Sequence, residues 1–116
     1  MAGTLQQRLG QQGEDRALAY LQQQGLHLLE RNFRCKVGEL DLIMQHGALL
    51  VFVEVRQRAC HRYGGAAASV TPAKQRRLLR AAQYFLLRYA ALPPCRFDLL
   101  AIDGENLSWM QNVLEM

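Results

Sequence analysis

The chain has 116 residues and a net charge of +4, and 50% of its residues are hydrophobic. This length fits one domain and excludes a two-domain enzyme, while the apolar content excludes a disordered chain. No apolar run approaches the roughly 18 residues of a membrane span, and the first residues lack the layout of a signal peptide. We therefore expect a cytoplasmic protein with no membrane partner and a single domain over residues 1–116.

The first half of the sequence predicts one helix followed by three strands. A helix is expected over residues 4–24, where apolar side chains recur at helical spacing at Leu5, Leu9, Ala17, Tyr20 and Leu21. Strands are expected over residues 26–34, 38–45 and 49–55. The third strand is continuously apolar apart from one acid, which is typical of a strand covered on both faces. We therefore expect it at the centre of a sheet.

The second half predicts a loop and a second helix. Residues 59–69 contain two glycines and four alanines without a clear period, which indicates a mobile loop. Thr71 and Pro72 suit the N-cap and the first position of a helix, and the Pro93-Pro94 pair is expected to end it. The expected buried stripe of this helix consists of Leu78, Ala82, Phe85 and Tyr89.

Two more strands complete the predicted fold. One is expected over residues 96–102, and an edge strand over residues 106–113 follows the Asp103-Gly104 turn. The resulting order is α-β-β-β-α-β-(β). This order predicts an α/β protein in which a mixed β-sheet is flanked by helices.

Positive charge is concentrated in the middle of the chain. Between Glu54 and Asp98 there is no acidic residue but there are nine basic ones: Arg56, Arg58, Arg62, Lys74, Arg76, Arg77, Arg80, Arg88 and Arg96. Such segregation suits a surface that binds a polyanion such as DNA, because each neutralised phosphate releases counterions. A solvated basic helix is the other interpretation, and charge alone leaves both open.

Two acids interrupt apolar strands. Glu54 stands between two valines, and Asp41 stands between two leucines. With a two-residue hairpin loop at His46-Gly47 or Gly47-Ala48, both carboxylates point to one face and lie opposite or diagonal to each other. Such a pair of oxygen ligands, completed by water and phosphate, suits Mg²⁺. The sequence therefore predicts a metal site that could act on a phosphodiester.

Strand alternation places Arg56 and Arg58 on the face of Glu54. They could stabilise the charge that develops on a phosphate, or Arg56 could form a buried ion pair with Glu54 or Asp41. Other chemistry finds no support in the sequence. The cysteines Cys35, Cys60 and Cys95 lack a C-x-x-C pair and are expected to be reduced, and no phosphate loop or histidine metal spacing is present.

The chain resembles the YraN family of small bacterial proteins. The resemblance lies in these segments: Gly13-Glu14-Asp15-Arg16-Ala17, Gly38-Glu39-Leu40-Asp41-Leu42-Ile43, Phe52-Val53-Glu54-Val55-Arg56, Lys74-Gln75-Arg76-Arg77 and Arg96-Phe97-Asp98. It implies a restriction-endonuclease-like fold related to archaeal Holliday junction resolvases, with the PD-(D/E)xK nuclease pattern. Carried over by position, Asp41 and Glu54 are metal-binding acids and Glu14 completes the site for Mg²⁺ or Mn²⁺.

The chain departs from this pattern at Arg56, where E-x-K requires a lysine. Arginine stays charged, so it can stabilise phosphate charge but cannot act as a base. We therefore expect either a metal-dependent endonuclease acting on structured or branched DNA or a nucleic-acid-binding module with weak or no catalysis. A protein-interaction subunit is a third alternative, and the oligomeric state stays open, with a homodimer among the options. The residues expected to bind DNA are Arg58, Arg62, Lys74, Arg76, Arg77 and Arg80.

Overall fold

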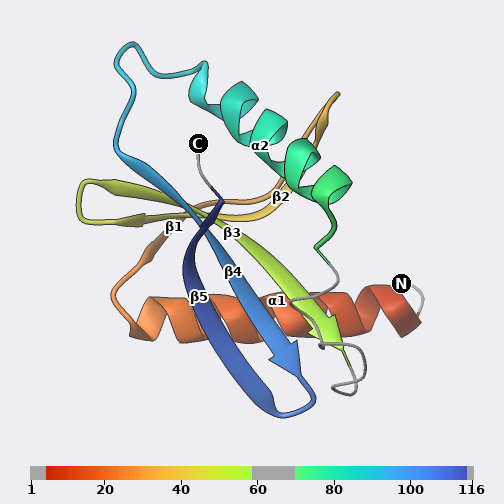
Figure 1. Ribbon diagram of the computed structural model, residues 1–116. Helices are drawn as coiled ribbons and strands as arrows, with labels where there is room; N and C mark the ends of the chain where they lie inside the picture. Colours follow the sequence, from red (N-terminus) through yellow and green to blue (C-terminus); the bar gives the residue numbers. More distant parts are fainter. Residues whose placement is uncertain (1–4, 59–69, 115–116) are drawn as a thin grey trace.

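The computed structural model describes residues 5–58 and 70–114 and contains one five-stranded sheet with two helices (Figure 1). The elements follow the order α1 (Leu5–Gln23), β1 (His27–Cys35), β2 (Gly38–His46), β3 (Leu49–Arg58), α2 (Pro72–Leu86), β4 (Cys95–Asp103) and β5 (Asn106–Leu114). The expected α/β class and element order are confirmed. The segment predicted as a mobile loop, residues 59–69, lies outside the described residues.

The sheet is mixed and has the strand order β1-β2-β3-β4-β5. Three neighbouring pairs are antiparallel, whereas β3 and β4 are parallel and are linked through α2. A parallel pair requires such a crossover, because the chain must return to the same end of the sheet. As expected, β3 lies at the centre, and it continues three residues beyond its predicted end.

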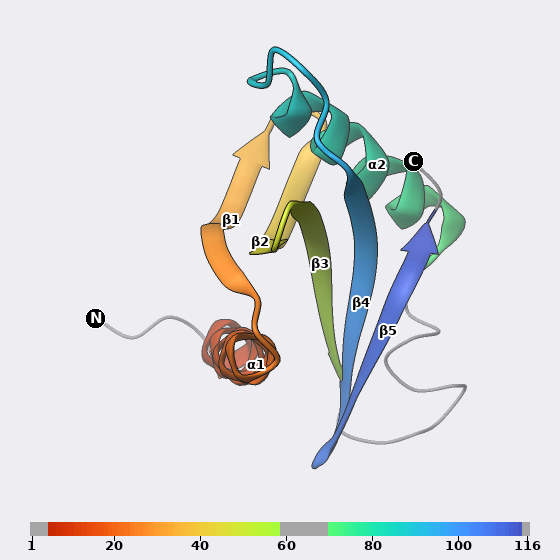
Figure 2. The same ribbon diagram turned by 90° about the vertical axis from the view of Figure 1, so that its left-hand side faces the viewer.

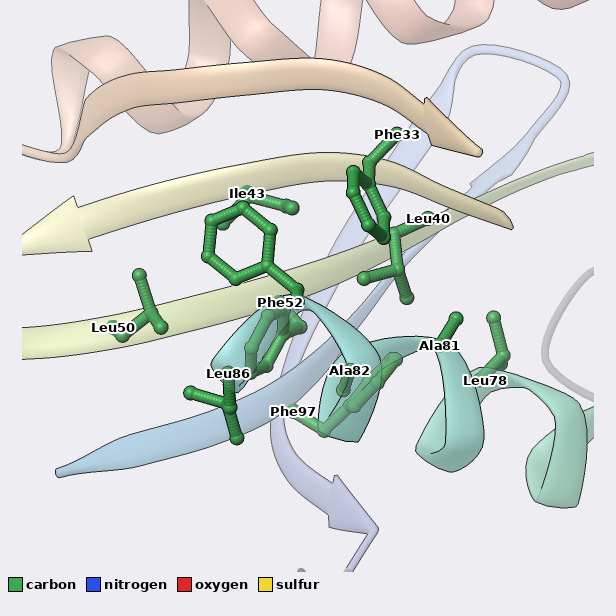
Figure 3. Close-up of a cluster of buried hydrophobic side chains, with 11 residues drawn as sticks. Phe33, Leu40, Ile43, Leu50, Phe52, Leu78, Ala81, Ala82, Leu86 and Phe97 are labelled. Atoms are coloured by element: carbon green, nitrogen blue, oxygen red, sulfur yellow. The ribbon is translucent and has the colours of Figure 1, made fainter. Parts of the chain in front are cut away.

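The two helices cover opposite faces of the sheet, as the edge-on view in Figure 2 shows. Alternate residues of β3 separate the two cores, since Leu50 and Phe52 pack towards α2 while Val51 and Val53 pack towards α1. Figure 3 shows the α2 side, which contains these buried residues: Phe33, Leu40, Ile43, Leu50, Phe52, Leu78, Ala81, Ala82, Phe85, Leu86 and Phe97.

The α1 side of the sheet has its own core. Its buried residues are Ala17, Leu21, Leu26, Leu42, Met44, Val51, Val53, Leu100 and Ile102, and Tyr20 packs against them. Of the stripe predicted for the first helix, the side chains of Leu5 and Leu9 lie outside the description. No helix in the described part of the chain has the length and hydropathy to cross a membrane. Cys35 and Cys95 are free thiols, as expected, and Cys60 falls in the undescribed segment.

Helix α2 begins where the sequence predicts and ends earlier. The Thr71 hydroxyl accepts a hydrogen bond from the Lys74 amide at 3.2 Å, as an N-cap does. After Leu86, three successive amides donate to the carbonyls three residues before them, so the chain tightens into turns well ahead of Pro93. Tyr89, predicted on the buried stripe, therefore lies beyond the helix and is only partly buried.

Both edge strands of the sheet are irregular. The register between β1 and β2 shifts between Leu28 and Glu30, and that between β4 and β5 shifts between Phe97 and Leu99. In both cases the extra residues lie in the edge strand. Each edge strand also contains an asparagine with positive φ, Asn32 at 56° and Asn112 at 57°.

Close contact between α2 and β2 depends on Gly38. A Cβ atom at this position would lie 3.0 Å from the carbonyl oxygen of Arg77, and the backbone has a φ of +155°. We expect Gly38→Ala to lower the free energy of unfolding by about 1–3 kcal/mol, because a backbone carbonyl cannot move aside as a flexible side chain can. Chemical denaturation measures this change.

Gly10→Ala in α1 is the matched control for this substitution. A Cβ atom there meets nothing within 4 Å, so the change should leave stability equal or raise it by up to about 1 kcal/mol through helix propensity. Equal effects of the two substitutions would show that the α2 contact does not restrict position 38.

Candidate functional site

Asp41 and Glu54 lie where the pairing of β2 with β3 stops. The hairpin loop is Gly47-Ala48, one of the two predicted alternatives, and the paired register runs from His46 opposite Leu49 to Leu42 opposite Val53. Asp41 and Glu54 are the next residues on the two strands. Here a side chain continues the pairing, because Asp41 Oδ2 accepts a hydrogen bond from the Val55 amide at 2.9 Å.

Burial and the charge of Glu54 shift the proton equilibrium of Asp41. Glu54 is only 4% exposed, and Asp41 is partly buried. Burial, followed by the charge of Glu54, raises the pKa of Asp41 to about 8, while the Val55 amide and the charge of Lys74 act in the opposite direction. The two carboxylates therefore interact directly, as the hairpin register predicts.

Two cations neutralise Glu54. Lys74 Nζ lies 3.3 Å from Glu54 Oε2, and Arg56 Nη1 lies 3.6 Å from the same oxygen. The ion pair considered for Arg56 in the sequence is therefore present. The sequence analysis placed Lys74 only among the DNA-binding residues. Its spacing in the sequence could have indicated a position next to Glu54, because Lys74 precedes the buried Leu78 by four residues and so extends the buried stripe of α2 by one turn.

Glu14 approaches the pair from α1 but is held by another residue. Its Oε1 accepts a hydrogen bond from Arg31 Nε at 3.3 Å, and Arg31 also pairs with Asp15. Burial and then the charge of Asp41 raise the pKa of Glu14, whereas Arg31 lowers it. Among residues 5–58 and 70–114, no group of three acidic, histidine or cysteine side chains is close enough to hold a metal ion. The three-acid site stays a prediction.

The remaining pair is a suitable donor set for a divalent cation. Asp41 and Glu54 offer carboxylate oxygens, the ligands that Mg²⁺ prefers. Burial is the main cause of the raised pKa of Asp41, and the charge of Glu54 raises it further. A divalent cation relieves repulsion of this second kind. These two residues therefore fit a metal site that water and phosphate complete.

A cavity of about 140 Å³ adjoins Glu54 between α2 and the sheet. Its lining is mostly apolar and consists of Glu54, Val70, Gln75, Leu78, Phe97, Asp98, Leu99, Val113 and Leu114. Apolar walls lower the local dielectric constant, which strengthens electrostatic interactions with the carboxylate.

The exposed face of α2 carries arginines that could meet a polyanion. Arg76, Arg77 and Arg80 are exposed, and none of them forms an ion pair with a described residue. Helical spacing places these residues on neighbouring positions of one surface. Of the other residues expected to bind DNA, Arg62 and the side chain of Arg58 fall in the part that is not described.

Asp98 is a buried acid for which the sequence analysis predicted no role. It is fully buried and accepts hydrogen bonds from Arg96 at 2.8 and 2.9 Å, from Trp109 Nε1 at 2.9 Å and from the Asn112 amide at 2.9 Å. An acid between apolar residues of β4 is the sequence signal for it. Because donors surround both of its oxygens, Asp98 shapes the junction of β4 and β5.

Comparison with known proteins places the chain in a family. Residues 13–102 match the model of the uncharacterised protein family UPF0102. A UPF0102 protein of Janthinobacterium sp. (strain Marseille) is 61% identical over 112 residues, which cover 97% of this chain and 91% of the relative. A UPF0102 protein of Herminiimonas arsenicoxydans is 62% identical over 112 residues, with 97% and 90% covered. The chain therefore belongs to UPF0102, the YraN family that its motifs indicated.

The raised pKa of Asp41 predicts a loss of stability as the pH rises. The native carboxyl keeps its proton to about pH 8, whereas the unfolded carboxyl releases it near its ordinary pKa of 3.8. The free energy of unfolding should therefore fall between pH 5 and pH 8. Asp41→Asn has no such proton to lose and should gain about 2–4 kcal/mol over the wild type across this interval, measured by urea denaturation.

Glu39→Gln is the control on the same strand, because the side chain of Glu39 is 60% exposed. It should follow the wild-type pH profile. If the profile of Asp41→Asn also runs parallel to that of the wild type, the carboxyl pair does not govern this pH dependence.

Proposed function

We propose that this protein is a metal-dependent endonuclease that acts on structured or branched DNA. The observation that carries the proposal is the pair of carboxylates, Asp41 and Glu54, with Lys74 and Arg56 beside it. Carboxylates that can hold Mg²⁺ and cations that can face a phosphate are the two components of phosphodiester hydrolysis. The resemblance to the YraN family implies a fold related to that of Holliday junction resolvases, and this relation supports branched DNA as the substrate class.

Asp41 and Glu54 would hold Mg²⁺ or Mn²⁺. When bound, the ion would lower the pKa of a water molecule and polarise the phosphodiester. Lys74 and Arg56 would offset the negative charge on the phosphate oxygens. In the reaction, the water oxygen bonds to phosphorus and the bond to one ester oxygen breaks. The water releases a proton to solvent, and the leaving oxygen takes one up.

The exposed arginines of α2 supply the binding surface in this proposal. Arg76, Arg77 and Arg80 lie on the same helix as Lys74, and the ammonium of Lys74 contacts Glu54 of the carboxylate pair. They would bind the DNA backbone together with Arg58 and Arg62, and they would contribute affinity with little sequence preference. The backbone would thus be held next to the carboxylates.

A nucleic-acid-binding module without catalysis is the second candidate. It is favoured by the ion pairs that already occupy the acids, since Glu54 contacts Lys74 and Arg56 and Glu14 contacts Arg31. Acids neutralised by such ion pairs can stabilise the fold without binding a metal ion. In this case the same basic face would bind DNA and no bond would be cut.

Cleavage assays separate the two candidates. We expect Mg²⁺- or Mn²⁺-dependent cutting of branched, flapped or single-stranded DNA, lowered at least about 100-fold by Glu54→Ala because a metal ligand is lost. Glu39→Gln, an exposed acid on β2, should leave the rate unchanged. Binding without cutting selects the module, and absence of binding at low salt rejects both candidates.

The role of the α2 arginines is tested by the salt dependence of DNA binding. Arg76→Gln with Arg77→Gln should weaken binding at all sequences and lower the slope of log K against log salt concentration by about 2, one unit for each lost phosphate contact. Gln22→Glu with Gln23→Glu on α1 makes the same change in net charge at exposed positions on the other face of the sheet. If both double variants have equal slopes, Arg76 and Arg77 face solvent and do not contact the DNA backbone.

A further inference from the structure

We infer that Lys74 is the catalytic ammonium of this site and takes the place that the E-x-K pattern assigns to residue 56. The inference rests on the proposed endonuclease function and names the side chain that touches the phosphate. In the pattern, the lysine follows the glutamate on the same strand. Here the required amine comes from the first turn of α2, on a different element of the fold.

Distances to Glu54 favour Lys74 over Arg56. Both cations approach the same oxygen, Lys74 at 3.3 Å and Arg56 at 3.6 Å. The charge of Lys74 also lowers the pKa of Asp41, against the larger effects of burial and of Glu54. Lys74 thus contacts Glu54 directly and acts on Asp41 only through its charge, and we place the reacting phosphate beside this pair.

The backbone beside Lys74 is fixed on several sides. Its amide donates to the Thr71 hydroxyl, and Gln75 Nε2 donates to the Val70 carbonyl at 3.2 Å. One turn further on, the carbonyl of Arg77 packs against Gly38 at the start of β2. A donor held in place before the reaction stabilises developing charge without a cost of reorganisation. The packing of α2 on the sheet therefore fixes the backbone from which Lys74 reaches Glu54, and the ion pair with Glu54 holds the ammonium.

The shape of the two cations gives them different tasks. An ammonium is compact and has three donors, so Lys74 can keep one on Glu54 and turn another to a non-bridging phosphate oxygen. Lys74 donates hydrogen bonds in this role and transfers no proton. The guanidinium of Arg56 is a planar fork on the strand that carries Glu54, and there it neutralises the buried carboxylate.

The chain permits a matched test because it contains only two lysines, Lys36 and Lys74. Lys36 is exposed in the turn between β1 and β2. Lys74→Met should lower kcat for cleavage of branched DNA by about 100-fold or more, with KM changed less than about threefold, because the ammonium acts on the transition state. Lys36→Met should retain wild-type values. Lys74→Arg, which keeps the charge, should still lose about tenfold.

Lysine labelled with ¹³C at Cε provides a readout that does not depend on cleavage. Only two signals are expected, and Mg²⁺ alone is the probe. Added Mg²⁺ should shift the Lys74 signal and leave that of Lys36 in place, and Asp41→Asn should abolish the shift. If Mg²⁺ leaves the chemical shift of the Lys74 signal unchanged, the inference is overturned even when the protein cleaves DNA.

The outcomes distinguish this inference from the proposed function. A wild type that cuts, with Lys74→Met and Lys74→Arg as active as Lys36→Met, overturns the role of Lys74 and leaves the endonuclease intact. A wild type that cuts no DNA with either metal overturns both. Thermal denaturation checks that each variant is folded, and should Lys74→Met fail to fold, the tenfold loss in Lys74→Arg decides.

Discussion

The hydrogen bond from the Val55 amide to Asp41 determines how the candidate site is assembled. It joins Asp41, one residue beyond the last paired residue of β2, to Val55, two residues beyond that of β3. It fixes the Asp41 carboxylate next to that of Glu54, which is almost fully buried. Two adjacent carboxylates in a low-dielectric setting need compensation by a proton or by cations. The protein uses both, since the pKa of Asp41 is raised and Glu54 contacts two basic side chains.

This need for compensation connects the site to the topology. Lys74 can reach Glu54 because the parallel pairing of β3 and β4 requires a crossover, and α2 lies in that crossover against the face where Glu54 points. The same helix turns Arg76, Arg77 and Arg80 to solvent. One amphipathic helix therefore supplies a cation inside the site and a basic surface beside it.

The sequence predicted what depends on periodicity and register. Alternation in β3 and a two-residue loop were enough to predict that Asp41 and Glu54 lie next to each other. Thr71 was enough to predict where α2 begins. It did not predict features that depend on packing between distant elements. The partners Arg31 for Glu14 and Lys74 for Glu54 come from other elements, and the early end of α2 depends on local turns rather than on proline.

The irregular edges of the sheet have a consequence for association between copies of the chain. A regular edge strand offers a row of unpaired amides and carbonyls onto which another strand can add. In β1 and β5, the shifted register and the left-handed asparagines Asn32 and Asn112 interrupt that row. In β5, the Asn112 amide is also turned inward to the buried Asp98. Both borders of the sheet are therefore poor templates for fibril growth.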